Sequence, residues 1–207
     1  MTDVKSPISY DPVMQAVHWA TLLAIMTIYG LVWGAHAGIA GQNFQAVMQL
    51  HRSLGLTVAG LTMFRLAWRC GTRVPDLPTD LPMVQKIAAR ATEGLIYLLL
   101  LAQPALGLIH TNAQGRRVDF YFLGQLPAIV APDRGLSRLT HQLHALGGNL
   151  LLAVIGLHAG AALFHHFIRQ DGVLRAMLPA CLHRGSERLR SGFGRGKLPA
   201  TKIGRSQ

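Results

Sequence analysis

The histidines are the residues whose type and spacing most directly suggest chemistry in this chain. The sequence has ten of them, and several lie within long apolar runs, where an ionisable side chain is costly and is a candidate for function. His144 and His158 are 14 residues apart on one run, so in a helix they face within about 40° of each other and lie about 21 Å apart along the axis. They cannot share one metal centre, but each could hold its own.

Each of these two histidines needs a partner at its own depth. His18 lies near the start of the first apolar run, and His51 lies near the start of the second. Helices joined by a short link run antiparallel, so these two should lie at opposite depths. Neutral imidazoles on facing helices of a bundle can hold haem iron. We therefore predict two bis-histidine haem sites. The inner pair is His18 with His158, and the outer pair is His51 with His144.

Other features near these positions leave alternatives open. His36 lies on the same face as His18 at the far end of its helix, and it could compete with His51 for the outer site. A zinc or copper site would need three or four converging ligands, and no carboxylate or thiol joins the histidines. Small residues near the pairs would give a flat macrocycle clearance, but they also favour ordinary helix packing. His110 and His141 are expected at the membrane interface. His165 and His166 could also be interfacial, or they could contact a propionate, a quinone or protons.

Four helices are predicted to position the histidines. Half of the residues are apolar and only 14% are charged, against roughly 25% in soluble proteins. Four charge-poor runs are long enough to cross a hydrocarbon core about 30 Å thick. These expected spans are residues 13–35, 47–68, 95–113 and 143–168. Residues 120–130 are expected to lie on the membrane interface. The predicted fold class is all-α, an integral membrane four-helix bundle of up-down topology.

The distribution of positive charge predicts the orientation. Fourteen Lys and Arg residues fall on the side that holds the N-terminus, the 69–90 loop and the C-terminal tail, and four fall on the other side, or five with Arg52. Since positive residues are retained in the cytoplasm, both termini are expected there. The polar start is followed by an apolar run of full span length, so the first helix is expected to be retained and not cleaved as a signal peptide.

The basic residues also bear on partners and on domain organisation. A formal net charge of +11 could indicate nucleic acid, but beside spanning helices it fits anionic lipid headgroups better. Residues 1–179 are expected to form the transmembrane di-haem domain, and residues 180–207, rich in Gly, Arg and Ser, are expected to form a disordered basic tail. Cys70 and Cys181 are far apart and both expected on the cytoplasmic side, so no disulfide is predicted.

Four stretches of the sequence carry a resemblance to a known family. They read AVHWATLLAIMTIYGLVW, LHRSLGLTVAGLTMFRLAWR, GLIYLLLLAQPALGLI and HALGGNLLLAVIGLHAGAALFHHF. Over residues 8–179 the chain resembles the bacterial cytochrome b561 family. In that family the haem ligands lie on the first, second and fourth helices, which agrees with the depth argument. Carried over to this sequence, the ligands are His18, His51, His144 and His158.

The resemblance implies a function in the bacterial inner membrane. Its expected cofactors are two haem b groups, with ubiquinone as the electron acceptor. Family members oxidise superoxide at the outer face and reduce ubiquinone, which makes the chain a candidate superoxide:ubiquinone oxidoreductase. Outer arginines could attract the superoxide anion, although for any single one of them loop solvation or headgroup contact is the better explanation. These residues are Arg52, Arg116, Arg117, Arg134 and Arg138.

Two other functions are compatible with the same residues. The chain could be a cytochrome b electron-transfer or anchor subunit of a membrane dehydrogenase or hydrogenase. It could also be a membrane protein without redox chemistry, whose histidines only bridge helices. The sequence leaves enzymatic activity and oligomeric state open.

Overall fold

The computed structural model describes residues 9–72, 75 and 81–178. Within them the chain is helical, and its only extended pairing is an isolated bridge between Asp119 and Gln125. The chain divides into two compact units, Met1–Met177 and Leu178–Gln207. All of the second unit except Leu178 lies outside the described residues, as do Cys181 and the expected tail.

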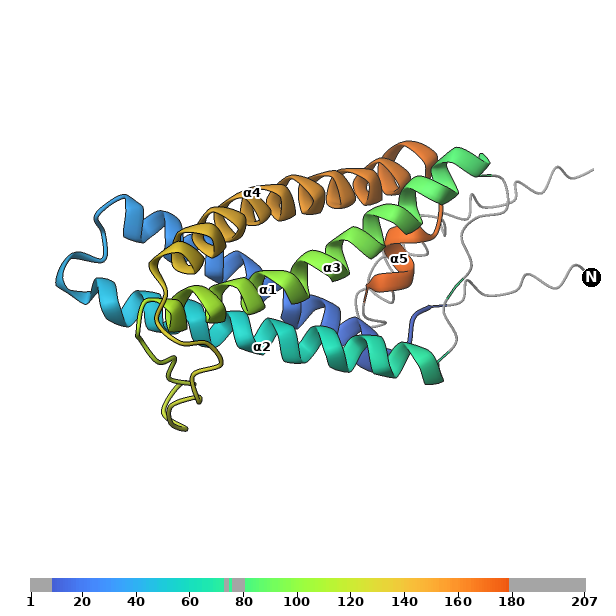
Figure 1. The fold of residues 1–207 in the computed structure, drawn as a ribbon. Coiled ribbons are helices and arrows are strands. Elements are labelled where there is room, and N and C mark those ends of the chain that lie inside the picture. Colours follow the sequence, from blue (N-terminus) through green and yellow to red (C-terminus); the bar gives the residue numbers. More distant parts are fainter. Residues whose placement is uncertain (1–8, 73–74, 76–80, 179–207) are drawn as a thin grey trace, which may run out of the picture. The chain divides into compact units, whose positions relative to one another are not determined.

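Four long helices form the first unit (Figure 1). They are α1 (Pro12–His36), α2 (Phe44–Gly71), α3 (Met83–Ala113) and α4 (Arg134–Phe164). Three short elements complete it: the 3₁₀ turn η1 (Gly41–Asn43), the π-helical turn η2 (His165–Arg169) and α5 (Val173–Met177). Asp11 begins α1 by accepting a hydrogen bond from the Val13 amide, and Asp133 begins α4 in the same way from Leu136, which satisfies amides that have no partner within the helix.

The described part of the chain contains helices that could span a membrane. Three segments are long and apolar enough to cross a bilayer: Pro12–His36, Met83–Ala113 and Arg134–Arg169. The fourth helix, α2, has 28 residues, or about 42 Å, but it carries three arginines, Arg52, Arg65 and Arg69, that lower its hydropathy. Helices α3 and α4 begin well before the expected spans at 95 and 143, because helical hydrogen bonding continues past the end of the apolar run.

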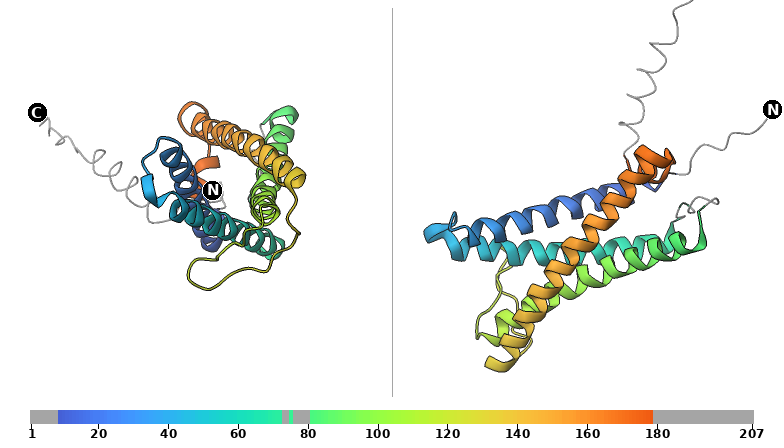
Figure 2. Two further views of the ribbon diagram at one scale, coloured as in Figure 1. Left: turned by 60° about the vertical axis from the view of Figure 1, so that its left-hand side comes forward. Right: turned by 90° about the horizontal axis from the view of Figure 1, so that it is seen from above.

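Helix packing leaves two helices apart from each other. Helix α1 packs on α2, α2 on α3, and α3 on α4, whereas α1 and α4 meet much less closely and diverge in the view from above in Figure 2. A hydrogen bond from the Tyr29 hydroxyl to the Gly148 carbonyl, at 2.6 Å, connects these two helices.

A central layer of apolar side chains lies among the four long helices. It consists of Ile25, Val58, Leu99, Leu100 and Leu151. The members from α1, α2 and α4 each follow a candidate histidine by seven residues, so they share its helix face. The layer therefore lies between the inner and outer levels predicted for the histidines.

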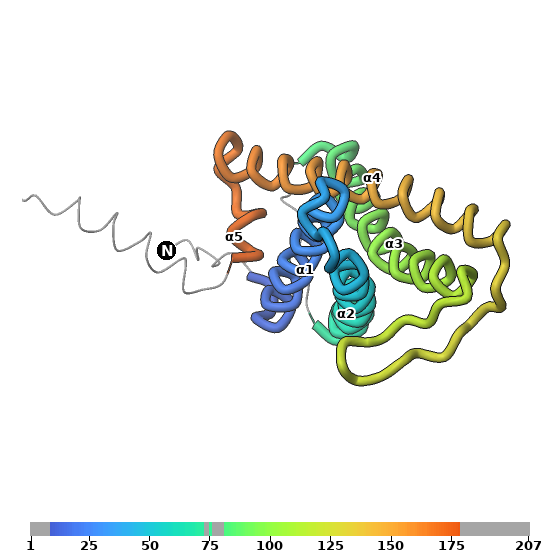
Figure 3. Tube along the Cα trace, turned by 90° about the vertical axis from the view of Figure 1, so that its left-hand side faces the viewer, coloured from blue at the N-terminus to red at the C-terminus, as the bar shows by residue number. Residues whose placement is uncertain are grey.

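The two ends of the bundle are closed differently. The loop end holds the 37–43 and 114–133 connections, and Figure 3 shows the longer one passing α2 on its way to α4. This connection is anchored on α2, because the Ser53 hydroxyl donates to the Asp119 carbonyl (3.1 Å) and accepts from the Tyr121 amide (3.0 Å). At its tip, Phe122 and Leu123 are 94% and 70% exposed, as expected of an interfacial segment.

The terminal end holds residues 10 and 11 and the short helix α5. The Gln15 side chain donates to the Ala176 carbonyl at 3.0 Å, and the Trp19 indole donates to the Met177 carbonyl at 2.9 Å. The Tyr10 amide also donates to Ala176. Helix α5 is therefore fastened to the first two turns of α1.

Candidate functional site

The structure brings His51 of α2 and His144 of α4 together at the loop end. Their ring centroids are 6.1 Å apart and their planes are inclined by 75°. A metal–imidazole nitrogen bond is about 2.0 Å long, and adding the ring radius on each side gives a centroid separation of roughly 6 Å for two imidazoles that would bind one ion. The spacing of this pair is therefore suitable for a metal ion between the rings.

Hydrogen bonding prepares His144 for such a role. Its Nδ1 lies 3.1 Å from the backbone carbonyl of Gln103 in α3. A carbonyl can only accept, so Nδ1 carries the proton and Nε2 keeps a free lone pair. Gly107 of α3 lies against the ring, and a Cβ there would be 3.4 Å from Cε1 of His144.

The His51 ring has different surroundings from the His144 ring. Nδ1 of His51 is buried without a hydrogen-bond partner, although buried polar atoms are usually paired. One turn further along the same face, nothing lies within 4 Å of the position that a Cβ on Gly55 would occupy. The α2 backbone one turn after His51 thus has open space beside it.

The second pair lies at the terminal end. His18 of α1 and His158 of α4 are near enough to interact electrostatically. Nδ1 of His18 is 3.1 Å from a guanidinium nitrogen of Arg65 in α2, and the same guanidinium is also within electrostatic reach of His158. The structure therefore brings the two predicted inner histidines within electrostatic range of each other and adds an arginine that contacts His18.

Charged groups surround this terminal-end pair. Arg69 of α2 forms an ion pair with Glu93 of α3, and the Arg65 guanidinium lies 5.5 Å from the centroid of the Tyr97 ring. Tyr10 is close enough to feel these charges. Burial, followed by the Glu93 carboxylate, raises the pKa of the Tyr10 hydroxyl above its usual value.

The last two candidate histidines lie in the π-helical turn after α4. Nδ1 of His165 is 2.5 Å from the Asp171 carboxylate, which also lies 3.7 Å from Arg169. Nδ1 of His166 is buried without a hydrogen-bond partner. π-Helical turns occur often at functional sites, so the roles that the sequence left open for this pair stay open.

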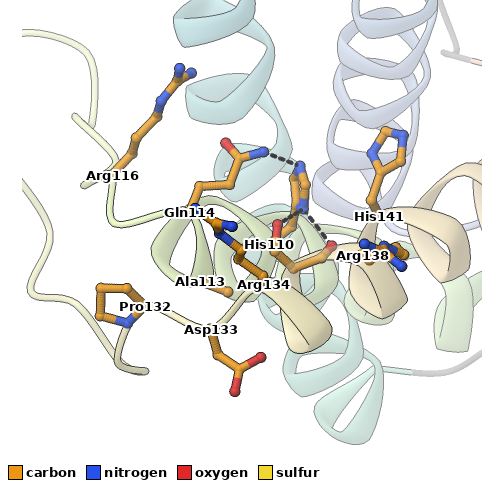
Figure 4. Close-up of a pocket in the computed structure, with 10 residues that line it drawn as sticks. His110, Ala113, Gln114, Arg116, Pro132, Asp133, Arg134, Arg138 and His141 are labelled. Carbon is orange, nitrogen blue, oxygen red and sulfur yellow. Dashed lines mark hydrogen bonds between the residues drawn. The ribbon is translucent and has the colours of Figure 1, made fainter.

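The remaining histidines lie at the loop end, where three of the predicted arginines line a pocket. His36 is exposed in the last turn of α1. His110 and His141 have ring centroids 5.0 Å apart and belong to the pocket drawn in Figure 4, which has a volume of about 850 Å³. Its charged lining residues are Arg116, Arg134, Arg138 and Asp133.

This pocket adjoins the loop-end pair and has an excess of positive charge. Its two histidines are within electrostatic reach of His144. Nδ1 of His110 donates to the Ser137 carbonyl at 2.9 Å, and its Nε2 accepts from the Gln114 amide at 3.1 Å. That arrangement fits a neutral imidazole. Three guanidinium groups against one carboxylate make the pocket attractive to a small anion.

Sequence comparison assigns the chain to a family. The family model of the prokaryotic cytochrome b561 matches residues 9–180. The chain belongs to this family. The resemblance seen in the sequence is thereby confirmed, and this cytochrome b561 is a multi-pass protein of the bacterial inner membrane that takes part in electron transport with haem b as the cofactor typical of its family.

Individual relatives cover most of the chain. Cytochrome b561 homolog 2 of Escherichia coli is 27% identical over 86% of this chain and 95% of its own length. The probable superoxide oxidase CybB of Yersinia pestis is 28% identical over 82% and 96%. Cytochrome b562 of Cereibacter sphaeroides is 30% identical over 82% and 94%.

The residues of this cytochrome b561 fit haem. In the described part of the chain no three or more His, Cys, Asp or Glu side chains converge on a metal position. A pair of histidines supplies only two ligands, and a porphyrin supplies the other four from its own nitrogens. The free Nε2 of His144 and the space beside Gly55 are features that such a group requires.

Two residues near the histidine pairs were not found by sequence reasoning. The backbone carbonyl of Gln103 has no sequence signature as a partner for His144, although a buried amide within an apolar run was a possible sign. Arg65 follows His51 by 14 residues, the same interval that separates His144 from His158. That interval could have placed Arg65 at the inner level.

Proposed function

We propose that this cytochrome b561 holds two haem b groups and passes electrons from superoxide at the outer face to ubiquinone. The outer haem would lie between His51 and His144, and the inner haem between His18 and His158. All four long helices would cross the membrane, with both termini in the cytoplasm. Residues 1–179 would form this transmembrane domain and residues 180–207 a basic tail.

The observation that supports this function most strongly is the arrangement of histidines on the two sides of the central layer. The pairs are about 21 Å apart along α4, with Val58 and Leu151 halfway between them. When bound, each haem iron exchanges one electron at a time. The central layer keeps water and ions out of the path between the levels, so only electrons would pass.

The loop-end pocket supports superoxide as the donor. Its arginines would attract the anion towards His144 and His51, and the product, O₂, is uncharged and would leave without electrostatic resistance. Two superoxide ions each lose one electron. One ubiquinone takes up these two electrons and two protons to form ubiquinol. The relative from Yersinia pestis, described as a probable superoxide oxidase, adds weight to this donor.

Haem content tests the proposed ligand pairs. Purified protein is expected to contain about two haems per chain with b-type bands in the reduced-minus-oxidised spectrum. His158→Ala and His51→Ala should each lose one haem and retain the other, while the double variant loses both. His36→Ala, which removes an exposed histidine at the loop end, is the matched control and should keep two. If His158→Ala kept both haems, the pairing would be wrong.

Activity separates the proposed oxidoreductase from the other functions. The purified chain in quinone-containing vesicles should reduce ubiquinone when superoxide is generated outside. Haem-loaded protein that is inactive with superoxide, but is reduced by a dehydrogenase or hydrogenase partner, would favour the subunit function. If the purified protein showed no b-type bands, the remaining alternative would be a membrane protein without redox chemistry whose histidines only bridge helices.

A further inference from the structure

Arg65 occupies the position on α2 that corresponds to His158 on α4. His51 and Arg65 are 14 residues apart with Val58 halfway, and His144 and His158 are 14 residues apart with Leu151 halfway. Residues at intervals of seven share a helix face, so Arg65 faces the same interior at the inner level. Its electrostatic reach to both His18 and His158 agrees with this placement.

No carboxylate neutralises Arg65 among the described residues. Its contacts are Nδ1 of His18 and the face of the Tyr97 ring, and its Nε is buried without a hydrogen-bond partner. The nearby carboxylate of Glu93 is bound by Arg69. A half-buried guanidinium without a bound carboxylate is unfavourable inside a membrane protein, so an anion at this position would stabilise the arginine.

The hydrogen bond between Arg65 and Nδ1 of His18 cannot form once that histidine binds iron through Nε2. A guanidinium has no lone pair, so in the present contact Nδ1 of His18 must accept. An imidazole that binds a metal through Nε2 carries its proton on Nδ1 and needs an acceptor there. Two donors would then face each other. Arg65 must turn to another acceptor, and His18 must find one as well.

The group that would bring about this change also supplies the missing charge. Haem carries two propionate carboxylates, and guanidinium binds carboxylates bidentately. We propose that Arg65 binds a propionate of the terminal-end haem, and that its positive charge raises the midpoint potential of that haem. The reason is that a nearby positive charge stabilises the ferrous form, which has one positive charge fewer than the ferric form. This inference rests on the proposed di-haem function.

Redox titration of charge variants tests the proposal. Arg65→Met should retain two haems and lower one of the two midpoint potentials. A tenfold fall in the ratio of reduced to oxidised haem at a fixed potential would correspond to 59 mV. Arg65→Lys keeps the charge but not the bidentate geometry. Its midpoint potential should lie between those of the wild type and Arg65→Met. Arg90→Met removes the same charge from an exposed position of α3 and should leave both potentials unchanged.

Loss of haem from Arg65→Met requires a second measurement. Apo-protein is then titrated with haem and with haem dimethyl ester, whose propionates carry no charge. At one of its two sites, wild type should bind haem more tightly than haem dimethyl ester. Arg65→Met should bind the two ligands equally well at that site. Equal preference in both proteins, or unchanged potentials in haem-loaded Arg65→Met, would overturn the role of Arg65 and leave the di-haem function intact. Wild type that binds no haem would instead refute the di-haem function.

Discussion

Single atoms at the loop end determine which chemistry each side chain can perform. The carbonyl of Gln103 holds the proton of His144 on Nδ1 and so leaves the lone pair of Nε2 free, in a ring whose centroid is 6.1 Å from that of His51. In the adjoining pocket, the Ser137 carbonyl and the Gln114 amide hold His110 in a neutral tautomer. The positive charge there comes from guanidinium groups, which do not titrate near neutral pH. Attraction of an anion to these guanidinium groups should therefore weaken strongly as salt is added.

Removing a pocket arginine should slow the reaction with superoxide. We expect Arg134→Gln and Arg138→Gln each to lower the second-order rate constant roughly a few-fold at low ionic strength, and the double variant to lower it further, because focused positive charge raises association rates. The difference should largely disappear at high salt, since ions screen exposed charges. Stopped-flow measurement of haem reduction by superoxide would check both effects.

The control for this prediction is Arg90→Gln, which removes one charge from an exposed site on α3 near the terminal end. Its rate constant should equal that of wild type. An equal decrease in Arg90→Gln would mean that net charge, and not the pocket, governs the encounter.

At the scale of elements, the contact between α3 and α4 positions the loop-end pair. Gln103 is 8% exposed, and its side-chain amide occupies the space that a Cβ on Gly147 would need. Gly107 of α3 in turn faces the His144 ring. Small residues on one helix thus receive polar side chains of the other, which lets the two backbones approach closely.

Filling this contact should destabilise the bundle. Gly147→Ala is expected to lower the free energy of unfolding by about 1 kcal/mol, because the Gln103 amide must leave a buried position. Gln103→Ala in the same chain should relieve the clash, so the two substitutions should be strongly non-additive. Thermal unfolding in detergent, followed by circular dichroism, measures the effect as a shift in Tm.

Gly148→Ala provides the matched comparison, since a Cβ there would lie 3.9 Å from Oε1 of Gln103, an ordinary contact distance. The Tm of Gly148→Ala should be close to that of the wild type. If Gly147→Ala and Gly148→Ala were equally stable, close packing of Gln103 against Gly147 would not be a feature of the folded protein.

At the scale of the whole molecule, the two ends of the first unit differ in chemistry. The loop end carries the arginine-lined pocket, and the terminal end carries the Arg69–Glu93 ion pair, the His165–Asp171 pair and the attachment of α5 to α1. The central layer separates them. A protein with such different ends must be inserted in one orientation for a directed electron transfer.

Orientation can be measured directly. We expect a C-terminal fusion to fluoresce as a cytoplasmic reporter, and alkaline phosphatase inserted within residues 121–124 to be active in the periplasm, because most Lys and Arg residues fall in sequence segments 69–90 and 169–205. A periplasmic C-terminus would reverse the proposed direction of electron transfer. It would also place the loop-end pocket in the cytoplasm.

Sequence periodicity alone was enough to determine the features that run along a helix. The apolar runs predicted membrane-spanning helices, and the 14-residue interval on α4 placed His144 and His158 on one face at two depths, because helical geometry is the same in every protein. The short link between α1 and α2 then indicated their antiparallel course. Iron binding by the four histidines stays a prediction.

Only the tertiary structure decided the features that depend on how helices are rotated against one another. It placed the Gln103 carbonyl on His144, directed Arg65 to His18, anchored the 114–133 connection on Ser53 and formed a pocket from residues on either side of that connection. These contacts join segments far apart in the chain. Their geometry depends on side-chain packing between helices, which the pattern within one helix does not specify.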